Sequence, residues 1–433
     1  MKPNIKNNFY WMFADRFLNL ALALIVTTII ARHYGPQDYG LFSFIVATYL
    51  TFGIIGHMGL AGYLEKQLAS DKKNYNILLR EAITFKGMGF CLAFLGINLF
   101  SYINFSDNYE IRMAILSVSG IYFIRPLESL DHFFISRLES SINTTSRIYS
   151  TIIGASLKFY IVFINYEIIW ILYAHIFQIF IYHFFQYIKF IRREKIFIKP
   201  INVDKNKFKS LFNDTWQLYL SAVSALLLLK VDKIMLMSII GPREVGIYQI
   251  STIFSEITYF IPAAIMASFT PRLVSIQGDK ARYHKEIQKI ADLIAYSSIS
   301  IILITYFLAP LILVKIFGTE YISAIDILKV HIFGCLFIYM RIFYERMLII
   351  DKKFHVIFIS SILGMILNIL LNYILIPGFE GMGAAYATLI SYGFSYLLIP
   401  LIYNESKIYV SRICDSFCNP KRILKIIHIQ VKN

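Results

Sequence analysis

Charged residues are scarce in this chain: only 16% of its 433 residues are Asp, Glu, Lys or Arg, whereas 57% are hydrophobic. A soluble protein of this length cannot bury so much apolar surface, so the composition excludes a soluble class and indicates a polytopic membrane protein. No stretch longer than about 25 residues is polar enough to form a soluble domain. The first 30 residues also lack a short apolar run with a small-residue cleavage site. We therefore expect the first span to be retained rather than cleaved.

Cysteine is also rare. The four cysteines, at positions 91, 335, 414 and 418, form no paired framework, and the two in the C-terminal tail have no histidine partners. We therefore expect no zinc site, and no other metal or cofactor. The chain also lacks a Gly-x-x-x-x-Gly-Lys-Ser/Thr motif, which excludes a P-loop ATPase.

Twelve hydrophobic runs of about 20 residues predict twelve transmembrane helices. We place them at 9–31, 39–64, 82–104, 113–135, 146–165, 168–190, 215–240, 246–270, 290–316, 326–350, 355–376 and 381–403. The predicted domains are an N-terminal six-helix lobe (1–190), a basic cytoplasmic linker (191–214), a C-terminal six-helix lobe (215–404) and a basic cytoplasmic tail (405–433).

One loop occurs twice. HYGPQDYGLF at 33–42 recurs as IIGPREVGIY at 239–248, each time between two hydrophobic runs. A repeat at half the chain length predicts two similar lobes. Pro fixes φ and Gly supplies positive φ, so the motif is typical of a turn. The turn residues that we predict are Gly35, Pro36, Gly40, Gly241, Pro242 and Gly246.

A second, weaker repeat supports the duplication. Tyr166-Glu167 precedes Tyr173-Ala174 in the sixth predicted span, and Phe379-Glu380 precedes Tyr386-Ala387 in the twelfth. Both repeats are offset by six spans, so the two lobes have the same orientation. We therefore expect parallel repeats, related by an axis along the membrane normal.

The formal net charge of +15 is distributed unevenly over the loops. By our count one side carries 29 basic residues, and the other only Arg32, Arg112, Arg243 and Lys315. Such asymmetry is the positive-inside pattern, which predicts that both termini lie in the cytoplasm. It also accounts for the basic charge without a nucleic-acid partner.

Several charges lie inside the predicted spans, where each costs about 2.5–3.5 kcal/mol unless it faces a cavity or a partner. Two alternatives to a site remain open. Arg125–Glu128 and Arg341–Glu345 have the helical spacing for internal pairing. Asp15 and Arg16 lie near enough to the cytoplasmic end to reach the interface.

Bases exceed acids among these charges, which favours an anionic substrate such as a diphosphate or an acidic sugar. The bases that we expect in a cationic cavity are Arg16, Arg125, Lys158, Lys230, Lys233 and Arg341. The acids that would pair with them or take up a coupling ion are Asp15, Glu128, Asp232 and Glu256.

The chain resembles the Wzx-type O-antigen flippases, polysaccharide transporters of the multidrug/oligosaccharidyl-lipid/polysaccharide (MOP) superfamily. The resemblance covers roughly residues 5–405. The residues that carry it are Ala31-Arg32, Gly35-Pro36, Tyr39-Gly40, Phe42, Gly59-Leu60, Asp232, Met235-Leu236, Gly241, Val245-Gly246-Ile247-Tyr248, Thr270-Pro271-Arg272-Leu273, Phe317-Gly318-Thr319-Glu320-Tyr321, Pro377, Gly381, Gly383-Ala384-Ala385 and Ala387-Thr388.

The resemblance implies an all-α, MATE-like fold of two six-helix lobes and transport by alternating access. The substrate would be an undecaprenyl-diphosphate-linked oligosaccharide, an O-antigen or related polysaccharide repeat unit, moved from the cytoplasmic to the periplasmic leaflet of the bacterial inner membrane. It further implies a role in lipopolysaccharide biosynthesis. Membrane lipids, a coupling ion (H⁺ or Na⁺) and the polysaccharide polymerase machinery would be the partners.

Three alternatives are weighed against this interpretation. A multidrug exporter of the same superfamily needs an anionic cavity, which the excess of bases disfavours. A lipid II flippase commonly carries two further spans. A membrane glycan polymerase or ligase needs a large outer loop for its catalytic groups, and every predicted outer loop has roughly ten residues or fewer. We therefore expect a transporter and no enzyme.

Overall fold

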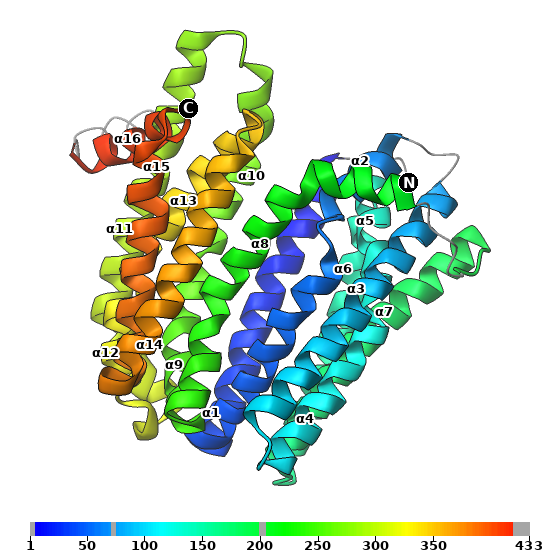
Figure 1. Cartoon of the computed structure of the whole chain (residues 1–433), viewed down its shortest axis with the longest axis vertical. Helices are drawn as coiled ribbons and strands as arrows, with labels where there is room; N and C mark the ends of the chain where they lie inside the picture. The colour runs from blue at the N-terminus through cyan, green and yellow to red at the C-terminus, as the bar shows by residue number, and fades with distance from the viewer. Residues whose placement is uncertain (1–4, 71–74, 199–204, 419–433) are drawn as a thin grey trace. The chain divides into compact units, whose positions relative to one another are not determined.

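The structure, a computed structural model, describes residues 5–70, 75–198 and 205–418 (Figure 1). Side chains at 5–17, 61, 66, 205–215 and 218 are not described. Every regular element in the described ranges is helical, so the expected all-α class is confirmed. The chain divides into two compact units, Met1–Tyr219 (unit 1) and Leu220–Asn433 (unit 2).

The described helices of unit 1 are α1 (Ile5–His57), α2 (Ala61–Ser70), α3 (Tyr75–Asn104), α4 (Tyr109–Ser119), η1 (Gly120–Phe123), η2 (Arg125–Glu128), α5 (Ser129–Ser136), α6 (Ser140–Phe163) and α7 (Ile168–Glu194). The next helix, α8 (Lys205–Ile239), begins in unit 1 and ends in unit 2. Part of the predicted linker 191–214 is therefore helical.

The remaining described helices all lie in unit 2. They are α9 (Pro242–Thr258), α10 (Phe260–Ser275), α11 (Lys280–Phe317), η3 (Thr319–Tyr321), α12 (Ala324–His331), α13 (Gly334–Ile350), α14 (Phe354–Gly393), η4 (Phe394–Leu398), α15 (Ile399–Ile402) and α16 (Asn404–Cys418). Helix α16 is polar on average and covers the first half of the predicted tail.

At two places a single glycine with positive φ separates consecutive spans. Gly35 interrupts α1 with φ 73° and ψ 177°, and Gly241 separates α8 from α9 with φ 130° and ψ −179°. This region of backbone space is essentially restricted to glycine. Gly40 and Gly246 were also predicted to be turn residues, and that prediction is wrong. Both lie inside helices and are buried, because the first glycine of each motif already reverses the chain.

Seven described segments are long and apolar enough to cross a membrane, and the bent pair α4–α5 makes an eighth. Two of these segments contain a break, at Gly35 and at Glu380 (φ 52°), so each holds two spans. Helices α6 and α8 are more polar but have 24 and 35 residues, which exceeds the roughly 20 needed to span a bilayer. Counted this way, the described residues contain the twelve spans that the sequence predicts.

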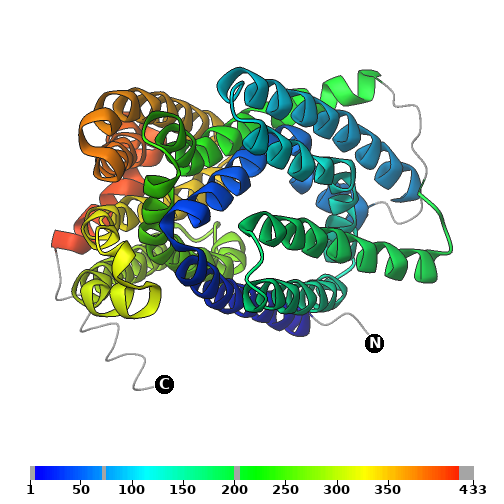
Figure 2. The same ribbon diagram turned by 90° about the horizontal axis from the view of Figure 1, so that it is seen from below.

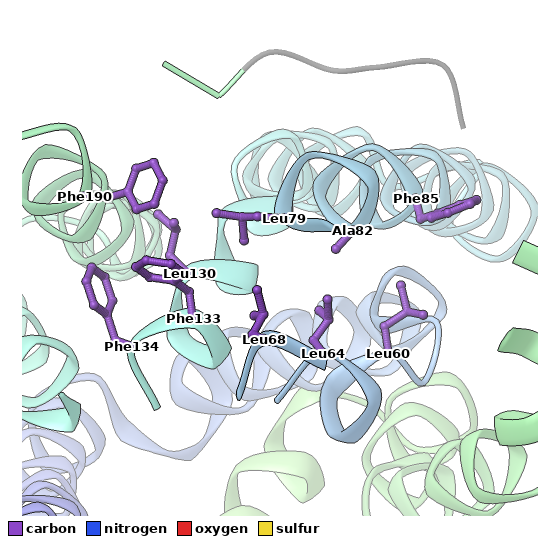
Figure 3. Close-up of a cluster of buried hydrophobic side chains, with 10 residues drawn as sticks. All are labelled: Leu60, Leu64, Leu68, Leu79, Ala82, Phe85, Leu130, Phe133, Phe134 and Phe190. Atoms are coloured by element: carbon purple, nitrogen blue, oxygen red, sulfur yellow. The ribbon is translucent and has the colours of Figure 1, made fainter. Parts of the chain in front are cut away.

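A cluster of buried apolar side chains packs α2, α3, α5 and α7 together at one end of unit 1 (Figure 3). Its members are Leu60, Leu64, Leu68, Leu79, Ala82, Phe85, Leu130, Phe133, Phe134 and Phe190. The guanidinium of Arg137 lies 4.2 Å from the centre of the Phe133 ring and binds Glu194 at 2.8 Å. This packing fixes α5 and, with it, the η2 turn that precedes α5.

Helices α6 and α7 run side by side through unit 1 (Figures 1 and 2). The buried face of α6 is rich in hydroxyl and amide side chains, among them Asn143, Ser146, Ser150 and Thr151. These polar side chains make α6 less hydrophobic than the other spans. They lie on its buried face, inside the unit. The same face carries Lys158.

Candidate functional site

Arg125 and Glu128 lie in η2, where the span formed by α4 and α5 bends by 46°. The Arg125 Nε donates a hydrogen bond to Glu128 Oε1, and His57 Nδ1 lies 3.1 Å from Glu128 Oε2. Arg125 also lies over the Phe90 ring, 5.9 Å from its centre. The internal pair that the spacing left open is therefore present, and it neutralises Arg125 within its own span.

Lys158 has a different environment. It lies in α6, is only 6% exposed, and donates to Gln178 Oε1 on α7 at 2.8 Å. The Gln178 amide lies 3.5 Å from Thr151 Oγ1, and Thr151 donates to Asn19 Oδ1 at 3.1 Å. Among the described side chains, no carboxylate lies within ion-pair distance of Lys158. An amide dipole, and not an acid, thus balances this buried ammonium.

Lys86 is a buried base of α3 that sequence reasoning missed. It is 1% exposed and lies within electrostatic reach of Glu128 and Asp131. Asp131 in turn accepts hydrogen bonds from Tyr182 and Gln186 of α7. Lys86 falls inside the third predicted span, so the rule that selected the other intramembrane charges would also have found it.

Both lysines of α8 share one acid. Lys230 Nζ lies 3.0 Å from Glu256 Oε2, and Lys233 Nζ lies 3.5 Å from Glu256 Oε1. The Lys230 side chain is 18% exposed, whereas that of Lys233 is only 2% exposed. Glu256 thus binds two ammonium groups, of which Lys230 is the more exposed, and Asp232 lies within electrostatic reach of Lys233.

Asp232 is an acid without an ion pair among the described side chains. It is buried and accepts hydrogen bonds from Tyr248 at 2.7 Å, from Thr388 at 2.6 Å and from Asn372 at 2.6 Å. The four residues come from α8, α9 and the two halves of α14. Asn372 Nδ2 also lies 3.1 Å from Asn368 Oδ1.

The amides beside Asp232 are incompletely bonded. Asn372 Oδ1 and Asn368 Nδ2 are buried and have no hydrogen-bond partner in the described part of the chain. A buried polar atom without a partner carries a desolvation penalty of about 1–3 kcal/mol, so its presence calls for a reason. Together the carboxylate, the hydroxyls and the amide oxygens form a cluster of the hard oxygen ligands that hard cations prefer.

Arg341 of α13 repeats the arrangement of Arg125. Its Nε lies 3.0 Å from Glu345 Oε2, and its Nη1 donates to Tyr396 at 3.1 Å. The guanidinium also stacks over the Tyr396 ring, 4.9 Å from its centre. The second internal pair that the sequence left open is therefore also present.

The bases described above thus fall into two groups, partly exposed and buried. Arg125, Lys230 and Arg341 are partly exposed, and each is bound to an acid. Lys158 and Lys233 are buried. A guanidinium has five N–H donors, so an arginine paired with one carboxylate retains donors for a second anion. Asp15 and Arg16 lie in α1, but their side chains fall outside the described part of the chain.

Sequence reasoning also missed the partners of Asp232. Asn368 and Asn372 are one helical turn apart in a predicted span, where hydrogen bonding between helices is the default interpretation. Tyr248 belongs to the repeated Gly-Pro motif and Thr388 to the residues that carry the family resemblance, but nothing in their spacing indicates that they meet Asp232. Only the packing of α8, α9 and α14 brings them together.

Residues 5–277 match the family described as polysaccharide biosynthesis protein, and residues 219–374 match MatE. The capsular polysaccharide biosynthesis protein CapF of Staphylococcus aureus is 22% identical over 407 residues, which cover 90% of this chain and 98% of CapF.

Two solved structures share the fold. The lipid II flippase MurJ in its inward closed conformation has a TM-score of 0.63 and 16% identity, with 98% of this chain and 92% of that chain covered. An inward-facing multidrug resistance MATE family transporter of the MOP superfamily has a TM-score of 0.66 and 11% identity, with 92% and 96% covered. The predicted MATE-like fold is therefore confirmed.

Proposed function

Because this chain belongs to the polysaccharide biosynthesis protein family, we propose that it is a flippase for lipid-linked oligosaccharides. It is a multi-pass membrane transporter of the MOP superfamily and not an enzyme, as the sequence predicts. The proposed substrate is an undecaprenyl-diphosphate-linked repeat unit of an O-antigen or a related polysaccharide. The proposed direction is from the cytoplasmic to the periplasmic leaflet of the inner membrane, with both termini in the cytoplasm.

The family match over residues 5–277 is the observation that carries this proposal. The distribution of loop charge supports the orientation, since basic residues remain on the cytoplasmic side during insertion. Intramembrane bases support an anionic cargo, because an exposed cation in a low-dielectric site attracts a diphosphate strongly.

Arg125, Lys230 and Arg341 are the bases that we assign to the anion. Each is partly exposed. Lys158 and Lys233 are enclosed in their units, so their charges would act on the substrate through the field and not by contact. Arg16 remains a candidate from its sequence position alone.

Asp232 is the acid that we assign to the coupling ion. Glu128 and Glu256 are already bound to bases, whereas the hydrogen bonds of Asp232 come from neutral donors and Lys233 acts on it only through the field. A Na⁺ ion there would be held by the carboxylate and the Thr388 hydroxyl, and by the Asn372 amide oxygen once the amide turns over from the Nδ2 bond that it makes to Asp232. Binding Na⁺ would neutralise the buried charge and satisfy the unpartnered amide oxygen.

Deletion with complementation tests the function. We expect the deletion strain to lose its surface polysaccharide and to accumulate lipid-linked repeat units in the membrane, and the wild-type gene to restore both. A deletion strain with full surface polysaccharide and no accumulated intermediate would show that the proposal is wrong. If lipid II accumulates instead, the chain serves the peptidoglycan precursor.

Point variants in the same strain test the anion site. Lys230→Gln and Arg341→Gln each remove a charge-assisted hydrogen bond, which is worth about 1.5–3 kcal/mol, so export should fall about tenfold or more. The control is Lys315→Gln, which removes an exposed lysine at the end of α11. Export at the wild-type rate in both site variants would exclude these bases as anion ligands.

Thermal unfolding of the purified protein tests the ion site. Since a ligand that binds only the folded state stabilises it, the wild-type protein should unfold at a higher temperature in NaCl than in KCl. Asp232→Asn should abolish this difference, and Asp326→Asn, at an exposed acid of α12, should retain it. Equal unfolding temperatures of the wild-type protein in both salts would exclude Na⁺ at Asp232.

A further inference from the structure

The two sequence repeats meet each other inside each unit. The first repeat is the Gly-Pro turn, which joins the halves of α1 in unit 1 and joins α8 to α9 in unit 2. The second repeat is the turn between α6 and α7 in unit 1, and the break within α14 in unit 2. Neither turn belongs to the charged clusters described above.

In unit 1 the contact is made by a tyrosine. Tyr34 lies directly before Gly35, and its hydroxyl donates to the backbone oxygen of Tyr166 at 2.6 Å. Tyr166 follows Asn165, which has φ 55° at the turn between α6 and α7. The two residues are 132 positions apart in the sequence, so this hydrogen bond fixes the relative position of two helical hairpins.

In unit 2 a carboxylate makes a contact between the corresponding two turns. Glu244, in the first turn of α9, places its carboxylate against the backbone of Gly381. Gly381 follows Glu380, whose φ of 52° breaks α14. The approach is close: a Cβ atom on Gly381 would lie 2.9 Å from Glu244 Oε2 and 2.8 Å from Ile327 Cδ1. Glycine is therefore required at position 381 by its neighbours.

We infer that these contacts form a turn latch in each unit, Tyr34–Tyr166 in unit 1 and Glu244–Gly381 in unit 2, which holds four helix ends together during transport. Without the latch, the first two spans of each unit could separate from the last two by local opening at the repeated turns. The same two repeated turns are joined in both units, but by different positions of the motif: Tyr34 directly precedes Gly35, whereas Glu244 follows Gly241 by three positions.

Hydrogen–deuterium exchange of the full chain in lipid nanodiscs tests the latch of unit 2 directly, since the Gly381 amide lies beside the Glu244 carboxylate. Glu244→Leu removes the acceptor and should speed exchange of the Gly381 amide roughly two- to tenfold, the range expected for one lost hydrogen bond. Glu244→Gln keeps an oxygen acceptor and should retain slow exchange. Unchanged exchange in Glu244→Leu would overturn the proposal for unit 2.

A pair of glycine variants tests the same latch with the carboxylate in place. Gly381→Ala forces a Cβ into Glu244 and Ile327, so exchange in the turn around position 380 should rise. Gly378→Ala is the matched control, because a Cβ there meets no atom within 4 Å. Equal exchange in the two variants would contradict the close contact.

The unit 1 latch is tested with Tyr34→Phe, which removes only the hydroxyl oxygen. Exchange in the turn at 164–168 should rise, whereas Tyr109→Phe, at an exposed tyrosine that begins α4, should leave it unchanged. Exchange at the wild-type rate in Tyr34→Phe would overturn the proposal for unit 1.

The role in transport rests on the proposed function and has its own readout. In the complemented deletion strain, Tyr34→Phe and Glu244→Leu should slow export, and Glu244→Gln and Tyr109→Phe should not. Faster exchange with undiminished export would show that the latch has no part in transport. If the deletion strain has no export defect at all, the proposed function fails, and the exchange rates alone decide whether the latch exists.

Discussion

Replacing Glu256 with glutamine should destabilise unit 2 strongly, because one carboxylate balances two lysines. At the observed distances of 3.0 and 3.5 Å, each attraction is worth about 5 kcal/mol before desolvation at an effective dielectric constant of roughly 20. Removing one partner of a buried ion pair typically costs about 3–5 kcal/mol, since the other charge remains buried without compensation. We expect a loss of that size, and Lys233 should account for most of it because only 2% of its side chain is exposed.

The assay is unfolding by SDS in mixed micelles, read as a change in the free energy of unfolding. Adding Lys233→Met to Glu256→Gln removes the stranded charge and should recover at least half of the loss. The control is Glu345→Gln. Arg341 keeps its bond to Tyr396 there, so the loss should be about 1–2 kcal/mol. A Glu256→Gln loss below about 1 kcal/mol, or no recovery in the double variant, would refute this reasoning.

Three further predictions concern the fold. Gly35→Ala should reduce stability by about 1–3 kcal/mol in the SDS assay, because only glycine tolerates that backbone conformation, whereas Gly120→Ala, in open space with φ −56°, should be neutral. Phe133→Ala should reduce it by about 3–5 kcal/mol, since the ring is fully buried in the core of unit 1; a smaller loss would show that neighbouring side chains refill the cavity. Burial and a hydrogen bond to Asp351 raise the pKa of Tyr409, so the folded protein retains this proton while the unfolded chain loses it above about pH 10. Stability should therefore fall as pH rises above 10, and fall less in Tyr409→Phe.

Much of the architecture is predictable from the sequence, because the bilayer imposes a simple constraint. A span must be about 20 residues long and apolar, so hydrophobic runs locate the twelve spans. The repeated Gly-Pro motif locates the breaks for an equally local reason, since Gly35 and Gly241 adopt a backbone conformation that other residues avoid. The second glycine of each motif was wrongly assigned to the turn, because a motif does not show which of its glycines takes the positive φ.

The site is less predictable, because the fate of an intramembrane charge depends on what packs against it. The sequence offers internal pairing of Arg125 with Glu128 and of Arg341 with Glu345 as one alternative, since helical spacing brings each acid within reach, and the structure contains both pairs. It does not show that Lys158 is bound to an amide of the neighbouring helix.

The sequence by itself therefore determined the class, the spans, the repeat and the list of charges, all of which follow from local composition and spacing. Only the tertiary structure decided which charged groups share a partner, which are buried and which have neutral partners. Lys233 and Glu256 are 23 positions apart, and Asp232 and Thr388 are 156 apart. Contacts over such separations depend on helix packing, and no local pattern encodes them.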